Sequence, residues 1–244
     1  MIGMQFKHNS RFVAPSKQED VEHLKDISVV ILADEMGYRM KSYGPKCLIP
    51  TRSGSNILLD QVNVIKKIFH NHEIILLTGF QSDKVSKRRP SEIRIVENQL
   101  HEETNSVEGF RLCLNNCLTD RILVLDGDLI FNEDAIFNIT RLGSSVLIDS
   151  KNKMDPMEVG VTIDKNLVIN FAYGLDIKWC KVVFLTGKEL QLAKNFCGKD
   201  RSRMYLFEML NYIVENDGKI RWMEPENFHL FKLDSIKEYH KLKG

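Results

Sequence analysis

Apolar runs and polar stretches alternate along the chain in a way that predicts strands followed by helices. Runs rich in Val, Ile and Leu are typical of buried strands, and they fall at residues 27–33, 73–78, 93–98, 121–128 and 145–149. Stretches with apolar residues at helical spacing lie between several of them, notably at 56–69 and 104–116. Strands that alternate with helices favour a parallel, doubly wound sheet. The predicted fold class is therefore α/β, with a mostly parallel sheet flanked by helices.

Beyond residue 150 the pattern changes to shorter elements. Strands are predicted at 158–163, 167–173, 179–186 and 229–235, and helices at 187–196, 204–216 and 236–244. We expect this second half, 151–244, to be a smaller region that shapes a substrate site beside the first half, 27–150. Residues 1–26 are polar and mixed in charge, and they are expected to form an N-terminal extension.

Composition excludes several classes of partner. The 244 residues include 34 basic and 33 acidic side chains, so no overall field draws in nucleic acid or a membrane surface. No apolar run approaches the roughly 20 residues that cross a bilayer, and the N-terminus lacks the pattern of a signal peptide. The five cysteines are irregularly spaced and predict reduced thiols rather than a zinc site. We expect a cytoplasmic protein, and the sequence is compatible with a homodimer.

The loop after the first strand combines one glycine and two bases. In open α/β sheets ligands bind at the carboxyl ends of the strands, and here Gly37, Arg39 and Lys46 follow such an end. Glycine lets backbone N–H groups approach a ligand, while Arg and Lys bind phosphate oxygens. The spacing is neither that of a P-loop nor that of a dinucleotide fold. On these residues alone, an ordinary surface loop is the competing interpretation.

Carboxylates follow two other predicted strands. Asp126 and Asp128 end the strand at 121–128, and Asp234 comes near the end of the strand at 229–235. Such carboxylates are hard oxygen ligands of the kind that Mg²⁺ binds, usually one or two together with phosphate oxygens and water. A solvated Asp-Gly turn and a charged residue in the first turn of a helix are the alternatives.

Four segments together resemble a known family. "VVILADEMGYRM...GPKCLIP", "IILLTGFQSDKV", "ILVLDGDLIF" and "LFKLDSIKEYHKL" stand in the order of the nucleotidyltransferases that build nucleotide-activated sugars and amino alcohols. The resemblance covers residues 27 to 244 and implies a glycosyltransferase-A-like, Rossmann-like α/β fold. "ENQLHEETNSVEGFRLCLNN" and the closing "LDSIKEYHKL" are most similar to the phosphocholine cytidylyltransferase branch.

Carried over by position, the resemblance implies roles for particular residues. Arg39 and Lys46 are expected to contact phosphates, and Asp128 and Asp234 to bind Mg²⁺, whereas Asp126 matches the family pattern less well. The residues implied to lie against the nucleotide are Leu32, Ala33, Gly37, Gly79, Gln81, Asn105 and Ser106.

The implied reaction is attack of a phosphate monoester on the α-phosphorus of a nucleoside triphosphate, with release of pyrophosphate. The second pKa of a phosphate monoester is about 6, so the nucleophile is ionised at pH 7 and needs no general base. The resemblance favours transfer of CMP from CTP to a small phosphorylated alcohol or amine such as phosphocholine. A sugar-1-phosphate nucleotidyltransferase is the alternative enzyme.

The start of the first loop departs from the family. The family reads Leu-Ala-Ala-Gly-x-Gly-x-Arg-Met, whereas this chain places Asp34 and Glu35 where alanine and glycine are usual. A residue that needed positive φ at Glu35 would be strained by roughly 1–2 kcal/mol. A carboxylate about 4 Å from phosphate would add repulsion of about 1 kcal/mol in water. A silent binding protein that has kept the fold is therefore a third hypothesis.

The acceptor site is the least specified part of the sequence. A trimethylammonium group is usually held by aromatic faces with a carboxylate nearby. The second half supplies several aromatic residues, and Trp179 and Glu208 are the predicted substrate contacts because they fall near aromatic and acidic positions of the phosphocholine branch.

Overall fold

The computed structural model describes residues 25–37, 43–235 and 239. The predicted N-terminal extension (apart from 25 and 26), Arg39 and most of the predicted C-terminal helix lie outside these residues. The strands are β1 (Lys25–Ala33), β2 (Asn71–Thr78), β3 (Arg94–Glu97), β4 (Arg121–Asp126), β5 (Leu129–Phe131), β6 (Ser145–Asp149), β7 (Val159–Asp164), β8 (Leu167–Tyr173), β9 (Ile177–Thr186), β10 (Arg221–Met223) and β11 (Leu230–Lys232). The helices are η2 (Lys46–Leu48), α2 (Ile57–Ile68), α3 (Ser82–Arg88), α4 (Ser106–Leu114), α5 (Asp134–Phe137), α6 (Gly187–Phe196), η3 (Lys199–Arg201) and α7 (Leu206–Glu215).

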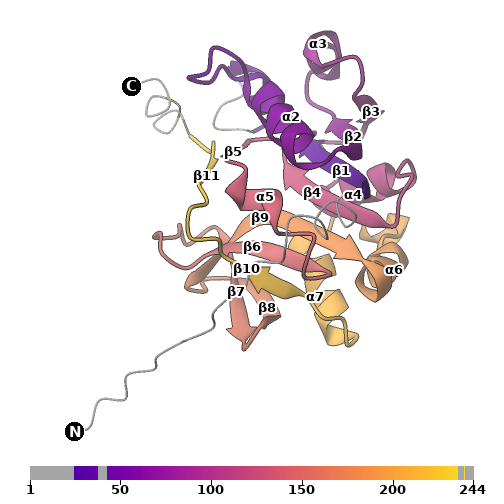
Figure 1. Cartoon of the computed structure of the whole chain (residues 1–244). Helices are drawn as coiled ribbons and strands as arrows, with labels where there is room; N and C mark the ends of the chain where they lie inside the picture. The colour runs from indigo at the N-terminus through magenta and orange to yellow at the C-terminus, as the bar shows by residue number, and fades with distance from the viewer. Residues whose placement is uncertain (1–24, 38–42, 236–238, 240–244) are drawn as a thin grey trace, which may run out of the picture.

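Nine of these strands form one mixed sheet, and the predicted α/β fold class, with a sheet flanked by helices, is confirmed (Figure 1). Their order is β3-β2-β1-β4-β9-β6-β10-β8-β7. The first four are parallel, whereas β9 runs antiparallel to both of its neighbours, β4 and β6. Strand β9, from the second half of the chain, therefore lies between β4 and β6, which both belong to the first half.

Helices cover both faces of the sheet (Figure 1). Alternate residues of β1 point to opposite sides, so Val29 packs in a core cluster with α2, while Val30 packs in a second cluster with α4, α6 and α7. Helix α2 begins at a side-chain cap, since Asn56 Oδ1 accepts from Leu59 N at 3.0 Å. None of the described helices is long and apolar enough to span a membrane.

A short second sheet joins the middle of the chain to its end. Strand β11 pairs antiparallel with β5, directly after Asp128. Leu233 N then donates to Asp128 O at 3.0 Å, so the residue that follows, Asp234, is placed beside Asp128. Neither β5 nor this pairing was predicted, because each strand is only three residues long.

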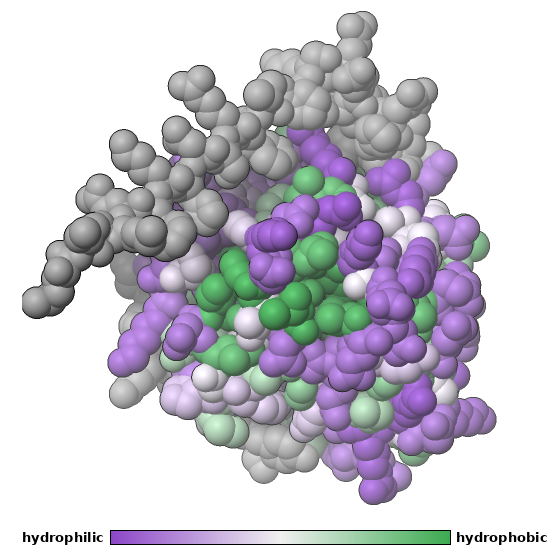
Figure 2. Space-filling model, turned by 90° about the horizontal axis from the view of Figure 1, so that it is seen from below, coloured by the Kyte–Doolittle hydropathy of each residue, from purple (hydrophilic) through white to green (hydrophobic). Residues whose placement is uncertain are grey.

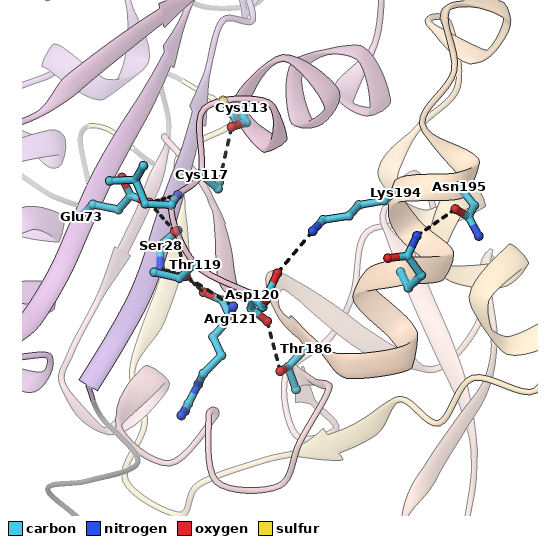
Figure 3. Close-up of polar contacts among 12 residues, drawn as sticks. Ser28, Glu73, Cys113, Cys117, Thr119, Asp120, Arg121, Thr186, Lys194 and Asn195 are labelled. Atoms are coloured by element: carbon cyan, nitrogen blue, oxygen red, sulfur yellow. Dashed lines mark hydrogen bonds and ion pairs between the residues drawn. The ribbon is translucent and has the colours of Figure 1, made fainter.

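Polar contacts brace the amino-terminal ends of the parallel strands, opposite the carboxyl ends at which ligands are expected (Figure 3). Ser28 N on β1 donates to Thr119 Oγ1 at 3.0 Å, and the Ser28 hydroxyl donates to Glu73 on β2. Asp120 accepts from Lys194 Nζ on α6 at 3.4 Å. These contacts fix β1, β2 and α6 relative to β4 at the base of the sheet.

The surface seen from below has an apolar area. Figure 2 shows hydrophobic residues gathered there and surrounded by hydrophilic ones. Apolar areas on a surface are common places of contact with other molecules. The homodimer considered from the sequence stays a prediction.

Candidate active site

A pocket opens at the carboxyl ends of β1 and β4. Both strands end in polar residues, since β1 leads into Asp34 and β4 ends at Asp126. The pocket is lined by Leu32, Ala33, Asp34, Glu35, Lys46, Cys47, Ser106, Asp126, Gly127 and Asp128. It therefore brings together residues from both strand ends and from the turn η2, as the strand-end rule predicts.

Lys46 lies between two carboxylates in this pocket. Its ammonium donates to Asp128 Oδ2 at 2.7 Å and to Asp234 Oδ1 at 3.1 Å. Burial alone would lower the pKa of Lys46, but the two carboxylates raise it above its ordinary value. Residues 46, 128 and 234, which are far apart in the sequence, thus meet around one positive charge.

The same two carboxylates suit a magnesium ion. Asp128 Oδ1 is buried and has no hydrogen-bond partner among the described residues, and Asp234 Oδ1 points to the same cation as Asp128 Oδ2. Mg²⁺ is commonly bound by one or two carboxylates together with phosphate oxygens. The described residues contain no group of three or more His, Cys, Asp or Glu side chains arranged for a metal. A site here would therefore depend on oxygens from the substrate.

Lys232 supplies a second cation, which was missed from the sequence. Its Nζ lies 3.3 Å from Asp234 Oδ1. Burial would lower the pKa of Lys232, but the charges of Asp128, Asp126 and Asp234 together raise it above its ordinary value. For Asp234 itself, burial opposes ionisation, and the two lysines more than offset it, so its pKa lies below the usual range. The pocket is therefore densely charged with both signs.

Lys181 is a third cation, also missed, and its charge acts on Asp126 although Lys181 is not among the residues that line the pocket. Burial raises the pKa of Asp126 to about 7, although Lys181 and Lys232 both act in the opposite direction. Burial also lowers the pKa of Lys181, and the nearby Asp126 offsets this only in part. In the sequence Lys181 stands inside the apolar run of β9, where the pattern gives no reason to place it at a site.

The two acids at the start of the first loop have separate surroundings. Asp34 is buried, and its Oδ2 accepts from Asn98 Nδ2 at 2.8 Å. Burial raises the pKa of Asp34 despite that hydrogen bond. Glu35 is exposed at the pocket, and it is not among the residues with positive φ. The strain considered at Glu35 is therefore absent.

Positive φ falls two residues later, on a glycine. Gly37 has φ of +57°, and a Cβ there would lie 2.7 Å from Lys46 Cε. Gly79 leaves no room either, because a Cβ would lie 2.6 Å from His101 Cβ and 2.8 Å from Asp34 O. Both glycines thus allow close packing of chain segments around the pocket.

The other residues predicted to contact the nucleotide divide into two groups. Leu32, Ala33 and Ser106 line the pocket, whereas Asn105 and Gln81 do not. Asn105 Nδ2 donates to Arg203 O at 2.6 Å, so its side chain fastens α4 to the segment before α7. Gln81 Oε1 is buried without a hydrogen-bond partner among the described residues.

Trp179 and Glu208, predicted to contact the acceptor, lie in structural positions. Trp179 is 1% exposed and packs edge to face with Phe171 at 5.7 Å between ring centres. Glu208 accepts from Tyr205 N at 2.7 Å at the start of α7. These placements favour roles in packing and helix capping.

Other aromatic residues do gather near Glu208. The rings of Tyr173 and Phe207 lie 5.4 Å apart, and those of Tyr205 and Phe207 lie 6.0 Å apart and stacked. Both tyrosines are about half exposed, at 50% and 46%. Next along α7, Leu206 N donates to the Ser106 hydroxyl at 2.8 Å, which connects this aromatic cluster to the lining of the pocket.

Comparison with solved structures places the fold in a known class. The inositol-1-phosphate CTP transferase from T. maritima has a TM-score of 0.72 at 16% identity, covering 88% of this chain and 94% of that chain. CTP:phosphocholine cytidylyltransferase from Streptococcus pneumoniae has 0.69 at 18% identity, covering 89% and 98%. A nucleoside-diphosphate-sugar pyrophosphorylase from Vibrio cholerae has 0.66 at 15% identity, covering 88% and 98%.

The chain therefore has the α/β fold of nucleotidyltransferases, as the sequence resemblance predicted. At identities this low the likeness defines the fold alone. No family model matches the sequence, and no curated protein matches it.

Proposed function

We propose that the protein is a Mg²⁺-dependent nucleotidyltransferase that transfers CMP from CTP to a small phosphorylated alcohol or amine such as phosphocholine. The observation that carries this proposal is the convergence of Lys46, Asp128 and Asp234 at one point of a pocket. A lysine offsets triphosphate charge directly, and two carboxylates can hold a Mg²⁺ ion that offsets more of it. The likeness to nucleotidyltransferase structures supports the same assignment.

In the proposed reaction an acceptor phosphate oxygen forms a bond to the α-phosphorus, and the bond from that phosphorus to the β-phosphate bridging oxygen breaks. Pyrophosphate leaves with the electron pair. The acceptor oxygen is already ionised at pH 7, so no residue has to remove a proton. Asp128 and Asp234 would hold Mg²⁺, which supplies charge neutralisation on phosphate oxygens when it is bound.

The remaining role of the protein is to bind the two substrates and to align them. Lys46 is placed to exchange one of its carboxylate contacts for a phosphate oxygen, because the triphosphate brings more negative charge than either aspartate. Cys47 also lines the pocket, but burial raises its pKa to about 12. It is therefore a neutral thiol rather than a nucleophile.

The aromatic cluster of Tyr173, Tyr205 and Phe207 supports an acceptor that contains an amine. Aromatic faces with a carboxylate nearby suit a quaternary or protonated amine, and Glu208 lies next to this cluster. A sugar-1-phosphate acceptor is the second candidate, because the nucleoside-diphosphate-sugar pyrophosphorylase has the same fold.

A pyrophosphate-release assay tests the proposal. The purified full chain with MgCl₂ is combined with CTP, UTP, dTTP or GTP and with a panel of phosphorylated amines and sugar 1-phosphates. We expect the highest rate with CTP and phosphocholine or a related phosphoamine. Asp128→Asn and Asp234→Asn should each lower the rate by at least 100-fold, a loss of about 2.7 kcal/mol in transition-state stabilisation. Asp164→Asn, an exposed acid on β7, is the control. Absence of pyrophosphate with every pair would contradict the proposal, and preference for a sugar 1-phosphate would favour the second candidate.

A further inference from the structure

Lys181 has an unusual backbone conformation inside a strand. Its φ is +59°, in the left-handed region that residues other than glycine and asparagine seldom adopt. The pairing of β9 with β6 is irregular at this place, because Val146 and Ile148 oppose Val183 and Trp179, so two steps along β6 match four along β9. Backbone outliers of this kind are often kept where a side chain has to be directed at a functional site.

The Lys181 ammonium is placed among charges but is not ion-paired. It lies 4.4 Å from the centre of the Trp179 ring, and it makes no hydrogen bond or ion pair with a described residue. The charges around it come from β4 (Asp126 and the nearby Asp128), from β11 (Lys232) and from the loop after β1 (Glu35). By contrast, the other two lysines of the site, 46 and 232, both contact a carboxylate.

The position of Lys181 in the sheet puts it on the opposite side of β4 from Lys46. The loop after β1 and the glycine after β2 lie on one side of β4, and β9 lies on the other. Lys46 comes from the first side, whereas Lys181 comes from the second, beside the end of β4 where Leu125 pairs with Val182. The two lysines therefore come from elements on opposite sides of β4.

We propose that Lys181 binds the phosphate group of the acceptor, so that the acceptor enters from the β9 side while the triphosphate lies on the β1 side. This inference rests on the proposed function. A phosphate monoester carries nearly two negative charges at pH 7 and would give Lys181 an anionic partner, which none of the described residues supplies at ion-pair distance. Burial disfavours the free ammonium. A ligand with two negative charges should therefore bind at Lys181 with a favourable free energy, whereas a neutral alcohol should gain little from this contact.

Substitutions of Lys181 distinguish an effect on acceptor binding from an effect on nucleotide binding. Lys181→Met keeps a long side chain without its charge, and Lys181→Gly also removes the strained conformation. For both we expect the KM for phosphocholine, or for whichever phosphate monoester proves active, to rise about 10- to 100-fold, as for loss of a hydrogen bond to a charged group. The KM for CTP should stay within about twofold. Lys178→Met, on the same strand and paired with Glu158, is the control and should change neither value.

Two further measurements distinguish binding from a structural role. Inorganic phosphate, titrated without nucleotide and followed by phosphorus NMR, should bind the wild type and bind Lys181→Met at least tenfold more weakly. The Tm of the Lys181 variants should equal or exceed that of the wild type, because each removes a poorly solvated charge. A lower Tm with unchanged acceptor KM and phosphate binding would overturn the proposal, and so would a rise confined to the KM for CTP. If the wild type binds no nucleotide, the proposed function fails, but the phosphate titration still decides the role of Lys181.

Discussion

Asp34 and Glu35 are neighbours in the chain, but their side chains lie in different surroundings. Asp34 turns inward and accepts a hydrogen bond from Asn98, which in turn donates to Thr104. Glu35 stays at the pocket, where its charge acts on Lys181 and on the groups around it. The sequence departs from the family pattern at both positions, and both residues line the pocket, but Asp34 is buried whereas Glu35 is exposed.

The buried carboxylate of Asp34 predicts a pH-dependent stability. Its pKa is raised above the ordinary 3.8 by burial, so the folded chain holds this proton more tightly than the unfolded chain. The contribution of Asp34 to stability therefore falls as the pH rises above about 4. Asp34→Asn keeps an oxygen that can accept from Asn98. It should leave the Tm unchanged near pH 4 and raise it by about 2–4 °C at pH 7.5, equivalent to about 1 kcal/mol.

Thermal unfolding of Asp34→Asn and wild type between pH 4 and 8 measures this difference. Asp176→Asn, an exposed acid between β8 and β9, is the control and should show no such trend. A Tm for Asp34→Asn below that of the wild type at every pH would mean that the ionised carboxylate stabilises the fold.

The exposed carboxylate of Glu35 predicts an effect on nucleotide affinity. A unit charge about 4–8 Å from phosphate contributes about 0.5–1 kcal/mol of repulsion in water. Glu35→Gln should therefore bind CTP roughly two- to fivefold more tightly, with the difference shrinking at high salt. Calorimetry with CTP and Mg²⁺ at low and high ionic strength measures it, and Asp164→Asn serves as the control. Weaker binding by Glu35→Gln would show instead that the carboxylate contacts the ligand or its metal.

Among the elements, those with a long apolar pattern could be predicted from the sequence, and of the three-residue strands only β11, inside the predicted strand at 229–235, was predicted. The predicted helix at 187–196 is found with the same bounds, and the predicted strands of the first half all form. Strands β5 and β10 were missed because three residues carry no period, and their pairing depends on partners far along the chain. Asp128 and Asp234 could be selected from the sequence because they stand at the ends of predicted strands. Lys181 could not be found this way, because its place in the site depends on a backbone conformation that the sequence does not reveal.

Helix α4 packs closely against strand β2 at Gly109, near the pocket. Alanine in place of glycine usually stabilises a helix interior by about 1 kcal/mol. At Gly109 a Cβ would lie 2.3 Å from Leu77 Cδ2 and 3.4 Å from Asp34 Oδ2, and Leu77 is fully buried. Overpacking in a core destabilises by about 1–3 kcal/mol. We therefore expect Gly109→Ala to lower the free energy of unfolding and to weaken CTP binding, because α4 also carries Ser106.

A double variant tests that explanation. Leu77→Val removes a methylene from the crowded place, so Gly109→Ala with Leu77→Val should be more stable than the sum of the single changes predicts. Denaturant unfolding of the four proteins gives the coupling energy, which should be at least 0.5 kcal/mol. If the two changes in unfolding free energy simply add, overpacking against Leu77 is not the cause of the destabilisation by Gly109→Ala.

At the scale of the whole molecule, the pocket lies where the two halves of the chain meet. The first half supplies Lys46 and Asp128, and the second supplies Asp234 at the end of a strand that crosses back to pair with β5. Three of the charged groups thus depend on contacts between distant parts of the sequence. A ligand that contacts all three would hold the two halves together.

Ligand binding should therefore stabilise the whole fold, and the effect should depend on metal. CTP at about 100 times its Kd adds about 2.7 kcal/mol to the free energy of unfolding, which for a chain of this size raises the Tm by about 5–10 °C. Because Asp128 and Asp234 would repel a bare triphosphate, we expect the shift with MgCl₂ and little of it with EDTA. Thermal unfolding with CTP, UTP and GTP under both conditions measures this, and Asp128→Asn should lose the magnesium-dependent part. A shift that is equal with and without magnesium would favour a silent nucleotide-binding protein. No shift with any nucleotide would contradict nucleotide binding itself, because the unfolded chain has no pocket in which to compete for the ligand.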